Sequence, residues 1–335
     1  MVGYIVRRLL QSIPTVFLIS LVLFFGMQAM PGGPLAAFAF NGHMSLAAQE
    51  AVIKRWGLDE PVYIQYFKWL TSMLRGDWQT SFMLHVPVRD AIASHLPATV
   101  FLMGFSYIVQ ELVALPAGIY AALRRYSAFD QFLTFMSYVL YSMPTFWLGL
   151  ILMMVFAVFV PIFPVGGIVD INTIGAGFLT AEYNQWFAQH PIDGILDLLH
   201  HLVLPAITIA AVGIAGDSRF MRASMLDTVH QDYVRTARAK GLPERVVVLK
   251  HALRNALLPI ITNIALTLPT LFSGAVVTEA IYSWPGMGQL YFQALSYSDY
   301  PLMMGVFFVA GVLVVFFNLL ADIAYAFIDP RISYA

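Results

Sequence analysis

Residues 131–160 read QFLTFMSYVLYSMPTFWLGLILMMVFAVFV, thirty consecutive positions without an acidic or basic side chain. A helix needs about 20 mostly apolar residues to cross the hydrocarbon core of a bilayer, so this stretch predicts a membrane-spanning helix. Pro144 lies inside the stretch and removes a backbone donor, which makes it either one long kinked helix or two short ones.

The whole chain shares this apolar character. Hydrophobic residues make up 59% of the 335 residues and charged residues only 11%, whereas an average soluble domain carries about 25% charged residues. This composition excludes a soluble globular domain, a disordered chain and a nucleic-acid-binding protein. Cysteine is absent, which excludes a disulfide framework, a cysteine metal site and a cysteine nucleophile.

Six apolar runs predict an all-α membrane protein with six transmembrane helices. They lie near residues 9–30, 98–123, 131–160, 198–218, 257–281 and 303–327. We expect the first run to be an uncleaved span, because the apolar core of a cleaved signal is only about 7 to 15 residues long.

The distribution of Lys and Arg favours six spans with both termini in the cytoplasm. Thirteen of the eighteen basic residues then lie inside, and the other five all lie in the long outer loop 31–97, while the outer loops 161–197 and 282–302 hold none. Cytoplasmic loops carry an excess of Lys and Arg, and a loop as long as 31–97 is translocated largely regardless of its charge. Dividing 131–160 into two spans would move the basic segment 219–254 to the outside, so we favour one span there.

The outer loop 31–97 contains helix signals of its own. Ser45 is a good N-cap for a helix that runs to Trp56, and Pro61 opens a second helix that Gly76 closes. The second helix is rich in aromatic residues: Tyr63, Tyr66, Phe67 and Trp69. Aromatic amphipathic helices lie at membrane interfaces, so this helix is either a docking surface for an outer partner or a structural lid on the membrane face.

The cytoplasmic segment 219–254 carries eight basic and three acidic residues. We expect helices broken at Gly241 and Pro243. A basic loop serves to orient the chain, but 36 residues exceed what a connection needs. The small residues Ala237, Ala239 and Gly241 would let another protein approach the backbone closely. We therefore favour docking to a cytoplasmic partner over a topological role alone.

Enzymatic motifs are missing. The four lysines follow Ile53, Phe67, Ala239 and Leu249, so no Gly-Lys-Ser/Thr phosphate loop is present. Gly-x-Ser-x-Gly and His-Glu-x-x-His motifs are also absent. We therefore expect no catalytic residue, no metal and no cofactor in this chain, and any ATP-driven step would need another subunit.

Glu111 is the one carboxylate that we expect near the middle of a span. Such a residue must face protein or water. It either lines a translocation path or forms a hydrogen bond to a neighbouring helix, and its position in the sequence does not decide between these roles.

Residues 232–242, DYVRTARAKGL, and 251–259, HALRNALLP, closely resemble the permease loop of ABC importers of the dipeptide/oligopeptide class. Further matches follow in the same order over nearly the whole chain, within 31–34, 57–66, 76–81, 96–99, 141–147, 278–288, 299–301 and 322–331. There are two departures. The glutamate that opens the general importer loop is absent, since Arg235, Thr236 and Ala237 occupy those positions, and Gly33 stands where the family usually has Asp.

The resemblance implies a single transmembrane permease domain, 1–335, with the type I importer fold. This chain and a homologous second permease subunit would form the path in the inner membrane, and an extracytoplasmic solute-binding protein would deliver the cargo. Two ATP-binding subunits would hold ATP and Mg²⁺ and dock on the cytoplasmic loop 219–256, where residues 232–259 couple to them.

The resemblance also places site residues, all of them expectations at this point. The coupling contacts are Arg235, Ala237, Lys240, Gly241, Leu242, Pro243 and Arg245. The candidate path residues are Glu111 and Glu279. The candidate contacts of the outer partner are Asp59, Tyr66, Asp77 and Trp284.

Two questions stay open, the class of transporter and the cargo. A secondary transporter or channel should contain inverted repeats and ion-coupling carboxylates in matched positions, and the sequence has no obvious internal repeat. Di- and oligopeptides are the expected cargo, with oligosaccharides, nickel complexes and glutathione as alternatives within the same architecture.

Overall fold

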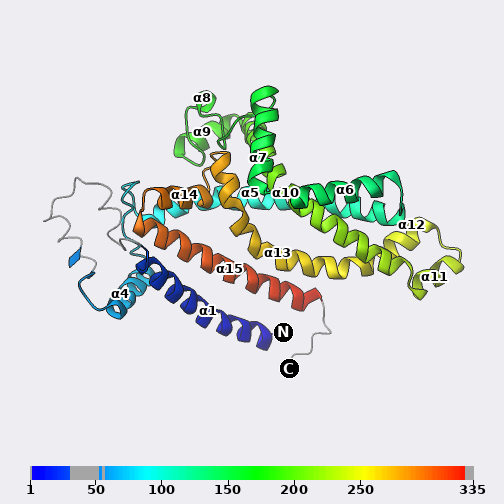
Figure 1. Ribbon diagram of the computed structural model, residues 1–335, viewed down its shortest axis with the longest axis horizontal. Coiled ribbons are helices and arrows are strands. Elements are labelled where there is room, and N and C mark those ends of the chain that lie inside the picture. Colours follow the sequence, from blue (N-terminus) through cyan, green and yellow to red (C-terminus); the bar gives the residue numbers. More distant parts are fainter. Residues whose placement is uncertain (1, 31–52, 55–56, 329–335) are drawn as a thin grey trace. The chain divides into compact units, whose positions relative to one another are not determined.

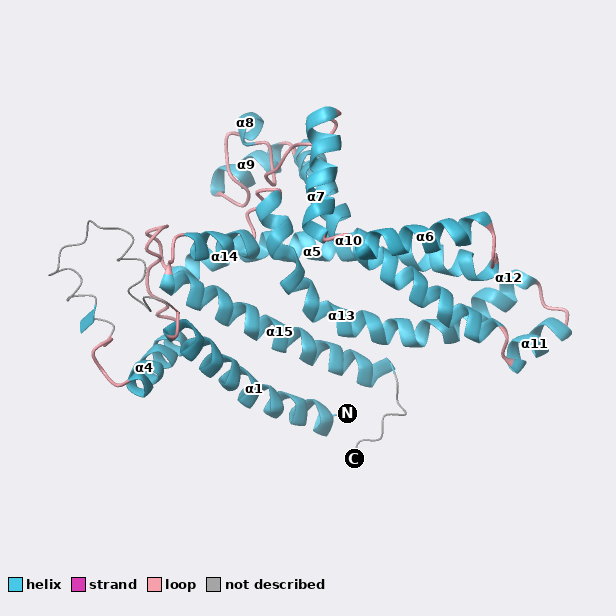
Figure 2. Cartoon of the chain, in the orientation of Figure 1, coloured by secondary structure: helices cyan, strands magenta, loops and turns pink. Residues whose placement is uncertain are grey.

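The computed structural model describes residues 2–30, 53–54 and 57–328. These residues form helices joined by turns and loops, and they hold no β-strand (Figure 2). One isolated β-bridge joins Thr80 to Pro87. The expectation of an all-α fold is confirmed, whereas the helix expected from Ser45 to Trp56 lies outside the described residues.

Four helices of the described residues are long and apolar enough to cross a membrane. They are α1 (Val2–Gln28), α5 (Val88–Leu123), α10 (Pro191–Val229) and α15 (Tyr300–Ile328). The helix α13 (Leu253–Ile281) has 29 residues, about 44 Å at 1.5 Å per residue. The six-span count and the cytoplasmic position of the termini stay predictions.

The apolar stretch 131–160 is bent by 104°. Its first part is α6 (Ala128–Ser142), and its second part is α7 (Thr145–Met153), which continues as the π-helix η2 (Met154–Phe159). The break falls at Met143 and Pro144, since proline cannot donate to the preceding turn and favours extended backbone in the residue before it.

Two helices extend well beyond the predicted spans. α5 has 36 residues and begins ten residues before the expected start at 98, while α10 has 39 residues and continues past 218 to Val229. At 1.5 Å per residue α10 is about 58 Å long, far more than the roughly 30 Å of a hydrocarbon core. The first part of the basic segment is therefore a continuation of a spanning helix.

The described residues divide into two compact units, one formed by 2–30, 53–54, 57–99 and 285–319 and the other by 100–284 and 320–328. The core of the first unit contains Tyr66 of α4 (Val62–Arg75), whose ring packs edge-on to Phe24 of α1 and whose hydroxyl lies 2.8 Å from Ser20 Oγ. As expected, α4 ends at Gly76, which has the left-handed φ of 81°.

A buried carboxylate, that of Asp299, accepts several hydrogen bonds in the first unit. Asp299, just before α15, accepts hydrogen bonds from Ser81 Oγ at 2.6 Å and from the backbone N–H of Met83 at 2.9 Å and Leu302 at 3.1 Å. The core of this unit also includes α14 (Met287–Ser296).

In the second unit α10 is the central element, and α6, α7 and α13 pack against it (Figure 1). Tyr282 closes this packing, since its hydroxyl donates to the carbonyl of Gly149 at 2.9 Å and lies 3.0 Å from Thr208 Oγ1. The loop before α10 carries the short helices α8 (Ile171–Ile174) and α9 (Ala181–Gln189). After α10 the chain forms α11 (Asp232–Ala239), α12 (Glu244–Val246) and the π-helix η3 (Val247–Ala252), which leads into α13.

Candidate functional site

The helix α11 has favourable charges at both ends. Asp232 lies in its first turn and Arg238 in its last turn, where an acidic and a basic side chain respectively complement the helix dipole. A helix of eight residues is nevertheless marginal by itself. Its stability must therefore come from packing against the rest of the second unit.

One face of α11 supplies this packing. Val234 and Ala237, three residues apart, are both buried, and residues three apart lie on the same side of a helix. They join an apolar cluster formed by α10, η3 and α13: Met221, Met225, Val247, Val248, Ala252, Ala256 and Ile260. Full burial of a Val or Met side chain contributes roughly 1.5 to 3 kcal/mol, so this cluster fixes α11 on the end of α10.

The chain leaves α11 through a tight turn. Gly241 has the left-handed φ of 74°, and no atom lies within 4 Å of the position that a Cβ would take. Glycine is required by the backbone angle here and not by lack of space. Pro243 then caps α12. The expected breaks at Gly241 and Pro243 are confirmed.

An ion pair that the sequence analysis did not anticipate spans this turn. Arg238 Nη2 lies 2.8 Å from Glu244 Oε1, and Arg238 Nε lies 3.2 Å from Glu244 Oε2. The hydrogen bonds from Arg238 hold the pKa of the Glu244 carboxyl below its usual value. The sequence could have indicated this pair, because a basic and an acidic residue lie on either side of the Gly-Leu-Pro turn.

The other face of this segment is open. Six of the seven expected coupling residues are exposed: Arg235, Lys240, Gly241, Leu242, Pro243 and Arg245. Apolar side chains lie exposed among them: Tyr233, Leu242, Val246 and Leu249. Ala237 differs, because it is buried in the cluster beneath α11. The structure therefore places Ala237 where it positions the helix, and the exposed residues where a partner can reach them. We call these exposed residues, from Tyr233 to Leu249, the coupling surface, after the role expected of them from the sequence.

Glu111 lies beside a second carboxylate. The amide nitrogen of Gln110 lies 3.4 Å from Glu111 Oε1 and 2.5 Å from Asp217 Oδ2, and thus connects α5 with α10. Asn263 Nδ2 of α13 donates to Asp217 Oδ1 at 3.0 Å. The sequence analysis missed Asp217 because it put this residue at the very end of a span, whereas α10 continues for three further turns.

The absence of a side chain at Gly213 leaves space for the Gln110 side chain in this polar cluster. A Cβ at Gly213 would lie 1.9 Å from Gln110 Oε1, so a larger residue would displace the Gln110 side chain. Gln110 itself is buried, and a buried amide must keep its hydrogen bonds. The arrangement brings two carboxylates, two amides and the phenol of Tyr107 together between three helices.

The remaining candidates divide into buried and exposed residues. Glu279, the second path candidate, is completely buried, and so are Trp284 and Tyr66. The backbone N–H of Trp284 donates to the carbonyl of Glu279 at 2.9 Å. Of the four expected contacts of the outer partner, only Asp59 and Asp77 are exposed. Tyr66 and Trp284 have places in the core instead.

Asp77 also lines a cavity of about 660 Å³ in the first unit. Its walls include Tyr63, Trp69 and Trp78. In the part of the chain that the structure describes, no three His, Asp or Glu side chains form a group that could hold a metal ion.

Comparison with known proteins covers the chain from end to end. Residues 114–334 match the family model described as "Binding-protein-dependent transport system inner membrane component". Residues 1–103 match the model described as "Binding-prot-dependent transport system membrane comp, N-term".

Full-length relatives carry related names. The "Oligopeptide transport system permease protein AppB" of Bacillus subtilis (strain 168) is 43% identical over 335 residues, which is 100% of both chains. The "Dipeptide transport system permease protein DppB" of Escherichia coli (strain K12) is 35% identical over 341 residues, 100% of this chain and 99% of the relative. The "Di/tripeptide transport system permease protein DppB" of Pseudomonas aeruginosa (strain UCBPP-PA14) is 36% identical over 337 residues, again 100% and 99%.

Proposed function

Because this chain belongs to the family of binding-protein-dependent transport system inner membrane components, we propose that it is the permease subunit of an ATP-driven importer of di- or oligopeptides. It is a multi-pass protein of the inner membrane. Its relatives at 35% to 43% identity are named as oligopeptide, dipeptide and di/tripeptide permeases. In this family the ATPase activity belongs to separate subunits.

The observation that carries the proposal is the two-sided packing of α11. Its buried face is fixed on α10, η3 and α13 through Val234 and Ala237, while Arg235, Lys240 and Arg245 remain exposed. A rigidly held surface that combines apolar and basic side chains suits a partner with an apolar, acidic groove. We assign this partner to the ATP-binding subunits, which bind ATP and Mg²⁺.

The complete transporter contains a homologous second permease, two ATP-binding subunits and an extracytoplasmic solute-binding protein. The exposed carboxylates Asp59 and Asp77 are the proposed contacts of the solute-binding protein, and the buried Tyr66 and Trp284 support the surface from within. This chain holds no cofactor and has no nucleic-acid partner in the proposal.

Glu111, together with Asp217, is the proposed polar site on the translocation path. Two carboxylates in one span region would favour the passage of a cationic group over that of an anionic one. The competing role is structural, because the bonds of Gln110 and Asn263 to Asp217 also tie α5, α10 and α13 together. Glu279 is buried, so it would line a path only in another conformation.

Reconstitution tests the proposal directly. The chain, the second permease, the two ATP-binding subunits and the solute-binding protein are purified and placed in vesicles with ATP inside. Uptake of a labelled tripeptide should require ATP and the solute-binding protein. Uptake that persists without ATP and stops when an ion gradient is dissipated would instead identify a secondary transporter. Uptake of an oligosaccharide, a nickel complex or glutathione in place of the tripeptide would correct the cargo.

A further inference from the structure

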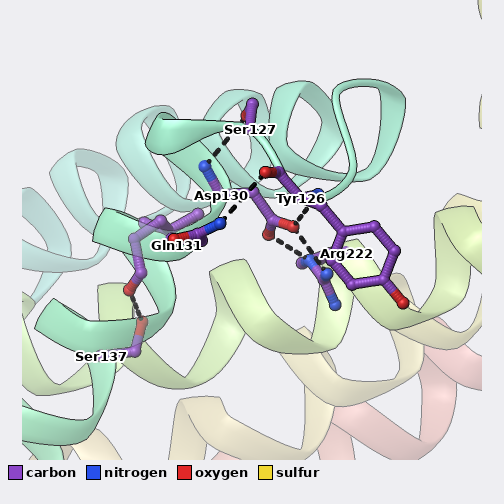
Figure 3. Close-up of polar contacts among 7 residues, drawn as sticks. Tyr126, Ser127, Asp130, Gln131, Ser137 and Arg222 are labelled. Atoms are coloured by element: carbon purple, nitrogen blue, oxygen red, sulfur yellow. Dashed lines mark hydrogen bonds and ion pairs between the residues drawn. The ribbon is translucent and has the colours of Figure 1, made fainter.

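An ion pair with a buried carboxylate joins the first turn of α6 to α10. Arg222 Nε lies 2.5 Å from Asp130 Oδ1, and Arg222 Nη2 lies 2.8 Å from Asp130 Oδ2 (Figure 3). Two parallel bonds between a guanidinium and a carboxylate fix their relative orientation as well as their distance. Asp130 is buried, so water does not compete strongly for this pair.

The same carboxylate shapes the turn that precedes α6. The backbone N–H of Tyr126 donates to Asp130 Oδ2 at 2.8 Å, and the backbone N–H of Asp130 donates to Ser127 Oγ at 3.2 Å (Figure 3). Tyr126 has a φ of 65°, which is uncommon for a residue other than glycine. Asp130 therefore holds the start of α6, and Arg222 connects that start to α10.

The stretch of α10 around Arg222 also carries the coupling helix α11. Its neighbour Met221 and the next-turn residue Met225 are completely buried in the cluster that contains Val234 and Ala237. Ser224 Oγ donates to the carbonyl of Ala256 at 2.7 Å and ties the same stretch to α13.

The backbone of α5 touches this stretch as well. A Cβ at Gly118 would lie 2.5 Å from the carbonyl oxygen of Ser218 and 2.8 Å from Met221 Cβ. Close-packed contacts of this kind transmit displacement instead of absorbing it. One segment of α10, residues 218–225, is thus in contact with α5, with α6 through Asp130, with α11 and with α13.

We propose that Asp130 and Arg222 are positioning residues of the transport cycle, which make α6 move as one body with the coupling helix α11. The inference rests on the proposed function, in which the ATP-binding subunits displace α11. With the pair intact, a displacement of α11 moves residues 218–225 and, through Arg222, the start of α6. Without the pair, α6 loses the one side-chain ion pair that joins it to α10 in the described part of the chain, and it follows the displacement incompletely.

Spin labels test the one-body movement. The sequence has no cysteine, so Phe132→Cys on α6 and Asp232→Cys at the start of α11, both exposed positions outside the coupling surface, provide a unique label pair. In the assembled transporter the distance between the labels should be the same with and without trapped nucleotide. In Asp130→Asn its distribution should become about twofold broader and should shift between the two states. A nucleotide-dependent distance in the unmodified pair, or an unchanged distribution in Asp130→Asn, would overturn the proposal.

Transport per ATP hydrolysed gives the functional readout. We expect Asp130→Asn to lower tripeptide uptake about tenfold while ATP hydrolysis falls less than twofold, and Asp130→Glu, which keeps a carboxylate for both Arg222 and the Tyr126 N–H, to retain at least half of the uptake. Arg89→Gln, which breaks an exposed pair with Asp90 in the first unit, is the matched control and should leave the ratio unchanged. An unchanged ratio in Asp130→Asn contradicts the proposal.

Measuring assembly of each variant with the other subunits separates a loss of folding from a loss of coupled movement. If Asp130→Asn does not assemble, Arg222→Lys replaces it, because lysine keeps the charge and loses the two-point geometry. Equal loss of uptake, hydrolysis and assembly in both variants would show a folding role alone and overturn the proposal. If the unmodified chain fails to bind ATP-binding subunits, the proposed function fails, which is a separate result.

Discussion

Two arginine–carboxylate pairs each hold a turn in the second unit, and they differ mainly in how far water reaches them. In the pair Asp130–Arg222 the carboxylate side chain is 4% exposed, whereas in Arg238–Glu244 it is 61% exposed. The closest N–O distances are similar, 2.5 and 2.8 Å. Burial, and not distance, therefore separates a pair that joins two helices, α6 and α10, from one that only closes a local turn.

The difference follows from the cost of leaving a charge unpaired. A carboxylate in a low-dielectric interior cannot exchange its lost partner for water, so breaking a buried pair is expensive. An exposed carboxylate recovers its hydration, and exposed pairs contribute little on average. The buried pair suits a permanent mechanical connection, and the exposed pair leaves the coupling surface able to adapt to a partner.

Arg222→Ala should have the largest effect on stability. It leaves the Asp130 carboxylate buried without its cation, and we expect a loss of roughly 3 to 5 kcal/mol in the free energy of unfolding. Unfolding in mixed micelles of mild and denaturing detergent, followed by circular dichroism, measures this loss. The matched control is Arg238→Ala, for which we expect at most about 1 kcal/mol. Equal losses in the two variants would remove the distinction between the pairs.

Gly241→Asp tests the turn that the exposed pair closes. A side chain at a φ of 74° costs roughly 1 to 2 kcal/mol, and under the proposed function it also places a negative charge on the coupling surface. Membrane insertion should stay intact, whereas peptide uptake should be lost and binding of the ATP-binding subunits weakened.

Gly76→Asp is the control for backbone strain alone. Gly76 has a φ of 81° and likewise has no atom within 4 Å of a Cβ position, but it lies in the first unit, in the loop predicted to be on the outside. It should retain binding of the ATP-binding subunits. Normal uptake by a well-expressed Gly241→Asp chain would exclude the coupling role of this turn.

Glu111→Gln extends the comparison to carboxylates within the spans. If Glu111 lines the translocation path, removal of its charge should change the uptake of cationic and anionic tripeptides unequally, by several-fold, at constant protein level. If Glu111 instead has a structural role, the uptake of both kinds of tripeptide should be nearly unaffected in Glu111→Gln, while Glu111→Leu should reduce assembly of the transporter. Asp217→Asn, which keeps the shape of the partner carboxylate, should shift the preference in the same direction as Glu111→Gln. Equal uptake of both cargo types in the Gln variant would rule out an electrostatic path role.

Glu244→Gln should have the smallest effect. Since the pKa of Glu244 is lowered in the folded chain, the contribution of the pair is complete above the ordinary pKa of a glutamate and declines as the pH falls through the lowered value. Stability should be indistinguishable from that of the unmodified chain at low pH and differ only slightly at neutral pH and low salt. A difference that persists at 1 M salt would contradict a screened, exposed pair.

The sequence alone predicted the features that depend on interactions between neighbouring residues. The uninterrupted apolar runs predicted an all-α membrane protein, and the composition excluded a soluble fold. The breaks at Gly241 and Pro243 and the end of α4 at Gly76 were predicted correctly, because glycine and proline act on their own backbone. The motif in 232–259 also indicated the correct family. Each of these features depends on residues adjacent in the chain.

The tertiary structure decided which side chains face inward. A spanning helix is apolar all round, so its periodicity does not reveal its buried face. An eight-residue helix such as α11 is too short to show that Ala237 packs inward while Ala239 is exposed. The pairing of Gln110 with Asp217 across 107 residues and of Asp130 with Arg222 across 92 depends on how the helices pack. Packing brings together residues that are distant in the chain, and the local sequence around one of them does not predict which distant residue it will contact.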